Sequence, residues 1–131
     1  RNPNSVRPWQ HVLEPVIAYL ILGIFIYEKP GEHSDAYNIG PLPEDHLSVK
    51  ELVEKAIAFW GNGNWIDQSH PDQPHESGLL KLNISKAKRE LNWQPRLNSA
   101  KAVEWTMNWY KCAPEKQVEF TFQQINDYFE L

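Results

Sequence analysis

The feature that most constrains this chain is a run of twelve apolar residues without a charge, residues 16–27 (VIAYLILGIFIY). A helix that spans a membrane needs about 20 apolar residues, and Glu14 and Glu28 bound this run on either side. We therefore predict a core or interface helix from Pro15 to about Glu28. A helix lying in a membrane interface is the alternative, although the run lacks the basic face that such helices use.

This predicted helix is apolar around its whole circumference, so we expect it to be covered on most sides. The sequence opens on Arg1 rather than on a methionine. We therefore expect residues 1–131 to be one part, a single domain or less, of a longer protein. An isolated chain would then expose apolar surface, which favours self-association.

The remaining pattern alternates short strands with helices, which predicts an α/β fold of several helices and a few short strands. Ser48-Val49-Lys50-Glu51 is a capping box, and the apolar positions that follow it have helical spacing up to Trp60. We predict an extended run at 9–13, strands at 36–40 and 79–82, and helices at 48–60, 83–91, 98–112 and 120–131.

Composition excludes several classes of protein. Hydrophobic residues make up 41% and charged residues 23%, which is typical of a globular chain. The net charge of -4 is not that of a general nucleic-acid binder. Cys112 is the one cysteine, so the chain has no disulfide framework, and a reducing, cytoplasmic setting is expected.

No complete active site is visible in the sequence. A dinucleotide fingerprint requires G-x-G-x-x-G between a strand and a helix, but the one G-x-G, Gly61-Asn62-Gly63, follows a predicted helix. No tyrosine is followed by a lysine four positions later, as catalysis in short-chain dehydrogenases requires. We therefore predict no catalytic residue and no cofactor-binding residue in this segment.

The loop 62–77 holds a polar cluster whose spacing matches no standard zinc motif. Ordinary loop polarity or a ligand contact explains it better than a metal, and we predict no metal site. The residues concerned are Asp67, His70, Asp72, His75 and Glu76.

A sharper signal precedes the apolar helix, where Arg7, Trp9, Gln10 and His11 fall within five positions. An arginine can offer a phosphate two parallel charge-assisted hydrogen bonds. A surface salt bridge is the plain alternative for Arg7, and core packing is the plain alternative for Trp9.

The chain resembles the CDP-glucose 4,6-dehydratase family, a branch of the extended short-chain dehydrogenases, over nearly its whole length. The more specific part of the resemblance is the run Arg-Pro-Trp-Gln-His-Val at 7–12 together with His75-Glu76. The motifs shared more widely are Tyr-Asn-Ile-Gly at 37–40, Ser85-Lys86-Ala87 and Leu-x-Trp-x-Pro at 91–95.

The resemblance implies the C-terminal, substrate-binding portion of an NAD-dependent lyase, with the Rossmann half missing. Such an enzyme oxidises the sugar at C4, eliminates water across C5 and C6 and returns the hydride to C6. The product, CDP-4-keto-6-deoxyglucose, leads to deoxysugars of surface polysaccharides such as the lipopolysaccharide O-antigen. The family's NAD fingerprint and its catalytic residues lie upstream, so this segment alone is expected to be inactive.

The resemblance also implies a substrate site for a CDP-sugar. Arg7 should hold the diphosphate, Trp9 and His11 should shape the adjoining strand, and Asn38 should face the nucleotide. His75 and Glu76 stand where relatives often carry an arginine near the phosphates. A carboxylate would repel a diphosphate, so Glu76 more plausibly contacts a sugar or ribose hydroxyl, or orients His75. No nucleic-acid or membrane partner is expected, and the protein should be a homo-oligomer.

Two alternatives remain open at the level of sequence. The chain could be the same portion of another nucleotide-sugar epimerase or dehydratase, which a different nucleotide preference would reveal. It could instead be a non-catalytic binding or assembly module derived from this fold.

Overall fold

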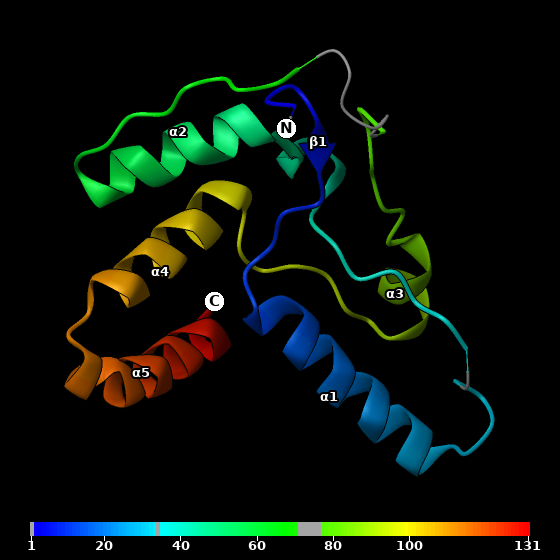
Figure 1. The fold of residues 1–131 in the computed structure, drawn as a ribbon. Helices are drawn as coiled ribbons and strands as arrows, with labels where there is room; N and C mark the ends of the chain where they lie inside the picture. The colour runs from blue at the N-terminus through cyan, green and yellow to red at the C-terminus, as the bar shows by residue number, and fades with distance from the viewer. Residues whose placement is uncertain (1, 34, 71–76) are drawn as a thin grey trace.

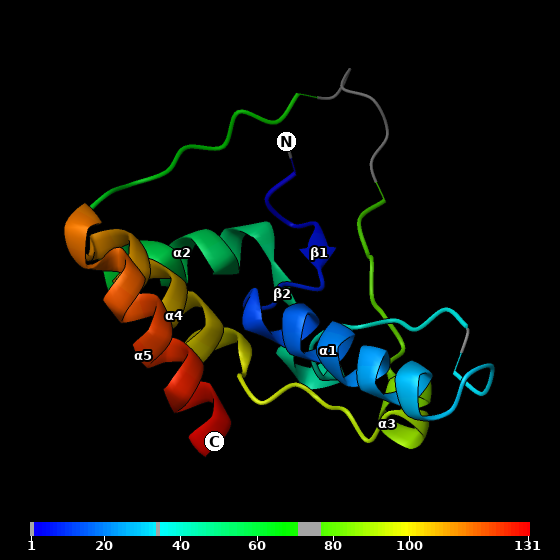
Figure 2. The ribbon, with the colours of Figure 1, turned by 90° about the horizontal axis from the view of Figure 1, so that it is seen from below.

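The computed structural model describes residues 2–33, 35–70 and 77–131, which form a mostly helical structure with one small sheet (Figure 1). Helices α2, α4 and α5 pack as one group on one side of the molecule. Helices α1 and α3 lie on the other side (Figure 2). The elements in chain order are β1 (Val6–Arg7), α1 (Leu13–Glu28), η1 (Pro43–Asp45), β2 (Leu47–Ser48), α2 (Val49–Trp60), α3 (Ser85–Glu90), α4 (Ser99–Lys111), η2 (Pro114–Lys116) and α5 (Gln117–Glu130).

Strand β1 lies between two neighbours. On one side it pairs antiparallel with β2, with Val6 opposite Ser48 and Arg7 opposite Leu47. On the other side it meets segment 78–80 in parallel, where the Val6 N–H donates to the Gly78 carbonyl at 2.8 Å and the Leu80 N–H donates to the Val6 carbonyl at 3.1 Å. The N-terminal segment is thereby held between two parts of the chain that are distant in sequence.

The helix predictions from local signals are confirmed. Ser48 Oγ accepts from the Glu51 N–H at 3.2 Å and the Glu51 carboxylate accepts from the Ser48 N–H at 2.8 Å, which completes the capping box of α2. Helix α2 ends at Gly61, whose φ of 99° favours glycine. Helix α5 begins at Gln117, three residues before the predicted position 120. The η2 turn, which begins at Pro114, leads directly into it.

Three predictions of extended structure are wrong wholly or in part. Residues 36–40 form no strand, because no described segment pairs with them and their carbonyls accept from side chains instead. The strand predicted at 79–82 is reduced to one bridge, at Leu79. The extended run predicted at 9–13 ends in a turn, where α1 begins. In this turn the Glu14 N–H donates to the His11 carbonyl at 3.0 Å.

Two clusters of buried side chains form the core, and residues of α1 pack in or against both of them. The first comprises Ala18, Ile84, Ala87, Leu91 and Trp93, and the second Leu97, Ala102, Trp105 and Tyr128. The described residues do not cover α1 on most sides, which agrees with the expectation that this chain by itself exposes apolar surface. Its outer face is open, with Tyr19 67% exposed, Leu20 60% and Tyr27 87%.

Among the described residues, no helix is both long enough and apolar enough to cross a membrane.

Candidate functional site

Arg7 lies on β1, in the middle of the three extended segments. Its side chain is half-buried, and Nη1 donates to the Val6 carbonyl at 2.8 Å. The backbone pairing on both sides of β1 fixes the point from which the Arg7 side chain extends. Partial burial strengthens its attraction for an anion, because water screens the charge less.

Trp9 contributes to packing and to a hydrogen bond across the sheet. Its indole Nε1–H donates to the Leu47 carbonyl at 3.2 Å. The ring lines a cavity of about 230 Å³ between α2 and α4, beside Leu52, Val103 and Met107. This placement fits the prediction that Trp9 shapes the strand, and it also fits the plain alternative of core packing.

His11 is buried, with 5% of its surface exposed, and its ring meets that of Trp105 edge-on at 5.8 Å. Burial lowers the pKa of the His11 imidazole, so the ring is neutral near pH 7. Nδ1 accepts from the Leu13 N–H at 3.3 Å, which places the proton on Nε2. A neutral, enclosed imidazole supports the turn into α1 and adds no charge for binding a phosphate.

Gln10 is a residue that the sequence reasoning named but did not assign to the site. Its Nε2–H donates to the Ile39 carbonyl at 3.1 Å, which joins the N-terminal segment to residues 36–40. Its Oε1 is buried, and no described residue donates to it. The residue also borders a second cavity, of about 400 Å³, which is enclosed further by His11, Trp109 and Tyr110. No sequence signal distinguishes this glutamine, because its partners lie about thirty residues away.

Asn38 is exposed and lies beside the segment that leads into α3. Its Nδ2–H donates to the Asn83 carbonyl at 3.4 Å. Gly40 allows this approach, because a Cβ on residue 40 would lie 3.0 Å from Leu82 Cδ1. The Tyr-Asn-Ile-Gly motif therefore brings the Asn38 amide against residues 82–83.

A third cavity, of about 390 Å³, opens beside this contact. His46, just before β2, is its most informative residue, because its Nε2 is buried and has no described partner. Sequence reasoning missed His46, since one histidine in a turn carries no signal of its own. The lining residues are Leu42, Pro43, His46, Lys81, Leu82, Asn83, Ile84, Ser85 and Lys88.

The two remaining predicted site residues, His75 and Glu76, lie outside the described residues. The described chain resumes at Ser77, next to the segment 78–80 that pairs with β1. Their predicted roles stay predictions.

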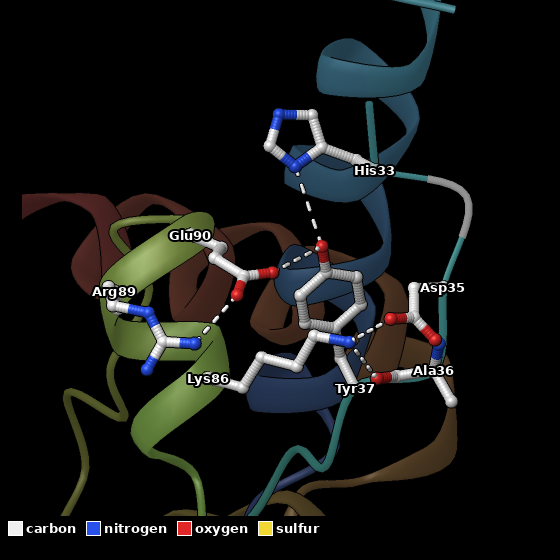
Figure 3. A network of polar contacts seen from close by, with 7 residues as sticks. All are labelled: His33, Asp35, Ala36, Tyr37, Lys86, Arg89 and Glu90. Carbon is white, nitrogen blue, oxygen red and sulfur yellow. Dashed lines mark hydrogen bonds and ion pairs between the residues drawn. The ribbon is translucent and has the colours of Figure 1, made fainter. Parts of the chain in front are cut away.

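Another polar cluster joins α3 to His33 and to residues 35–37 (Figure 3). Tyr37 donates to Glu90 at 3.1 Å, and the Lys86 ammonium bonds Asp35 while lying 4.6 Å from the centre of the Tyr37 ring. The bond to Asp35 raises the pKa of Lys86, and the same bond is the main reason that the pKa of Asp35 is lowered. The polar groups of this cluster bond one another, so we assign the cluster a structural role.

The Gly61-Asn62-Gly63 sequence does not have the geometry of a dinucleotide fingerprint. Gly61, the first glycine of the G-x-G, ends α2 in a left-handed conformation and does not open a helix. Among those same residues, no group of three or more histidines, cysteines and carboxylates is placed to hold a metal ion.

The sequence matches no family model. It is 35% identical over 131 residues to a CDP-glucose 4,6-dehydratase from Salmonella typhimurium, a match that covers 98% of this chain and 36% of that protein. The chain is homologous to nucleotide-sugar 4,6-dehydratases. This confirms the resemblance that the motifs indicated.

Two dTDP-glucose 4,6-dehydratases are more distant 4,6-dehydratase homologues. The one from Streptomyces niveus is 28% identical over 110 residues, and the one from Streptomyces antibioticus is 26% identical over 107 residues. Each match covers 82% of this chain and 30% of the relative. The chain thus spans about a third of the length of these 4,6-dehydratases, and its helices with one small sheet are compatible with an α/β fragment.

Proposed function

We propose that this chain is the substrate-binding portion of a CDP-glucose 4,6-dehydratase. The observation that carries the proposal is the 35% identity to the CDP-glucose enzyme across 98% of the chain. The identity to the dTDP-glucose enzymes is 28% and 26%, over 82% of the chain. This contrast favours CDP-glucose over dTDP-glucose, which remains the second candidate substrate.

In this proposal Arg7 binds the diphosphate. An arginine presents a planar fork of N–H groups that matches two phosphate oxygens. Its place on β1 supports the role, because β2 on one side and the bridge to Leu79 on the other hold the backbone of β1. Asn38 offers an exposed amide to the nucleotide, and His75 and Glu76 are proposed to contact the sugar or ribose.

The proposal extends to the whole protein only through homology. In the whole protein, an N-terminal Rossmann domain would bind NAD for the hydride transfer and would carry the catalytic groups. Nothing in the described residues takes those roles, so we propose that this segment is inactive alone. We further propose that the protein is cytoplasmic and homo-oligomeric. The open apolar face of α1, which includes Tyr19 and Leu20, supports self-association.

An amide NMR titration of the chain with CDP, and with UDP, GDP and dTDP as comparisons, tests the binding role. We expect CDP-selective shifts at Arg7 and Asn38. Replacing Arg7 by methionine should weaken CDP binding about tenfold or more, since a charge-assisted pair is lost. The control is Arg89→Met, which removes an exposed arginine that pairs with Glu90 on α3. Shifts that are equal for all nucleotides, or equal losses in both variants, would overturn the proposal.

A further inference from the structure

The second cavity, of about 400 Å³, lies where the segment before α1 meets α4 and α5. Its volume is within the usual range for small-molecule sites, roughly 300–1,000 Å³. None of the described residues that line it is acidic or is a lysine or arginine, and the lowered pKa of His11 keeps that ring uncharged near pH 7. The cavity therefore has no attraction for a diphosphate, and a ligand in it is independent of the function proposed above.

Two side chains in the wall of this cavity are polar and almost wholly buried. His11 is 5% exposed and Gln124 is 7% exposed. Both are held by Trp105, because the His11 ring meets the Trp105 ring edge-on and the Gln124 Nε2–H donates to the Trp105 carbonyl at 2.9 Å. One residue of α4 thus fixes two side chains that come from distant parts of the chain.

These two side chains offer the cavity one donor and one acceptor. His11 Nδ1 accepts from the Leu13 N–H, so Nε2 carries the proton. The Gln124 amide nitrogen bonds Trp105, so Oε1 is the atom left to accept. Neither His11 Nε2 nor Gln124 Oε1 has a hydrogen-bond partner among the described residues, and neither is one of their closed polar atoms. Both atoms are therefore available to a ligand.

Apart from the hydroxyl of Tyr110, an exposed residue, the other polar side chains of the wall are engaged elsewhere. The hydroxyls of Thr106 and Thr121 each donate to a carbonyl one turn earlier in their helices, at 2.8 and 2.7 Å. The Trp109 indole N–H donates to Thr121 Oγ1 at 2.9 Å. Gln10 Oε1 is closed, and its Nε2 bonds a distant carbonyl. A ligand inside is thus selected by the one donor and the one acceptor named above.

Aromatic rings form another part of the wall. The rings of Trp109 and Tyr110 lie 5.3 Å apart at an angle of 88°, and the bond from Trp109 to α5 holds its indole in place. Val12 and Leu13 add aliphatic surface. Such a wall favours a flat, apolar ring. A ring that carries an amide brings a carbonyl for the donor and an N–H for the acceptor at once.

We propose that this cavity binds a small, uncharged aromatic amide, whose carbonyl accepts from His11 Nε2–H and whose N–H donates to Gln124 Oε1. A carboxylate on the same ring has no hydrogen for Gln124, and its charge loses water without gaining an opposite charge. A ketone on the same ring keeps the carbonyl but also lacks the hydrogen. The cavity should therefore prefer these groups in the order amide, ketone, carboxylate.

The test titrates the unaltered chain with benzamide, acetophenone and benzoate, which carry these three groups on one ring. Backbone and side-chain NMR signals report the binding. We expect benzamide to bind about tenfold more tightly than acetophenone, as one buried hydrogen bond can provide, and benzoate to bind least. The shifts should centre on the indole N–H of Trp109, the side-chain amide of Gln124 and the backbone of Tyr110.

Gln124→Met tests the acceptor. Methionine has about the length of glutamine and offers no oxygen, so benzamide affinity should fall about tenfold, to that of acetophenone. Acetophenone affinity should stay unchanged, which also shows that the cavity is intact. His11→Asn tests the donor, because the asparagine oxygen can accept from the Leu13 N–H while the group at Nε2 is removed. Benzamide and acetophenone should then both bind several-fold more weakly.

Val12→Trp tests the location, since it narrows the cavity from an exposed position without altering either polar group. It should weaken all three probes together, whereas Val118→Trp, on the exposed surface of α5 outside the cavity, should weaken none. Absence of benzamide binding, or equal affinity for benzamide and acetophenone, would overturn the proposal. So would a benzamide preference that survives in Gln124→Met, or shifts that lie away from the cavity. None of these outcomes bears on CDP binding through Arg7.

Discussion

Two polar clusters each join parts of the chain that are far apart in sequence, and they differ in their access to water. The first is centred on Glu14, whose side chain is 0% exposed at the start of α1. Its Oε1 accepts from the N–H groups of Arg96 and Leu97 at 2.9 and 2.8 Å, and its Oε2 accepts from the Tyr128 hydroxyl at 2.7 Å. One carboxylate thus ties α1 to segment 96–97 and to the C-terminal end of α5.

The second cluster, shown in Figure 3, is open to solvent. The side chain of Asp35 is 67% exposed and that of Lys86 33% exposed. It links Asp35 and Tyr37 to α3 through ion pairs and hydrogen bonds, and the bond from Tyr37 to Glu90 is of the same kind as the one from Tyr128 to Glu14. In water, however, ions and dipoles are screened, and exposed pairs add little to stability.

The difference shows that a hydrogen-bond partner matters most where water cannot replace it. Removing one member of a buried cluster leaves the others without water or protein to bond. Removing one member of an exposed cluster lets water bond the rest. We therefore expect the first cluster to hold the fold together, and the second to set only the local position of residues 35–37.

The largest effect is expected from Glu14→Ala. It would leave two backbone N–H groups and a tyrosine hydroxyl unsatisfied in the core, and the cost should be about 3–5 kcal/mol of the free energy of unfolding. Urea unfolding followed by circular dichroism measures this. Glu28→Ala, at the exposed end of the same helix, serves as the control. If both variants unfold at the same urea concentration, Glu14 has no special role.

Glu14 also shows which part of the fold sequence can predict. Local signals predicted the helices well, since the capping box of α2 and the spacing within α4 involve residues a few positions apart. An acidic residue at the start of α1 indicates only a helix N-terminus. Its actual partners, near residues 96 and 128, are brought to it because Leu13 and Ile17 of α1 pack against the buried cluster that holds Leu97 and Tyr128, which no local pattern encodes.

The candidate site shows the same limit. The run 7–12 directed attention to the segment that becomes the centre of the sheet. His46 and the unpaired oxygen of Gln10 could not be found, because only the assembled fold buries them. The strand predicted at 36–40 failed for a related reason: a strand needs a neighbour, and the described residues provide none for that segment.

A smaller effect is expected from Tyr128→Phe, which removes one bond to the Glu14 carboxylate. At pH 7 the loss should be about 2 kcal/mol. Burial, with the bond to Glu14 as the second cause, raises the pKa of the Tyr128 hydroxyl above its ordinary value of 10. The hydroxyl therefore ionises near pH 10 in the unfolded chain but keeps its proton in the folded one.

The sign of the pH dependence follows. Above about pH 10 the unfolded state binds fewer protons than the folded state, so this group reduces stability by up to about 1.4 kcal/mol per pH unit. The phenylalanine variant lacks this loss. Unfolding of both chains at pH 8, 10 and 11 should show their difference shrinking as the pH rises. A difference that stays constant would mean that the Tyr128 pKa is not raised.

The smallest effect is expected from Lys86→Met in the exposed cluster. The substitution removes the bonds to Asp35 and to the Ala36 carbonyl and the contact with the Tyr37 ring. Because water can bond the released groups, the urea midpoint should not change measurably. Local order should change instead, with faster amide hydrogen exchange at residues 35–37 than in the unaltered chain. Exchange within α4 is the internal control, since the bonds removed with Lys86 are those to Asp35 and Ala36, outside α4. A clear fall in the urea midpoint would show that an open cluster can hold this fold as a buried one does, and the distinction between the two would fail.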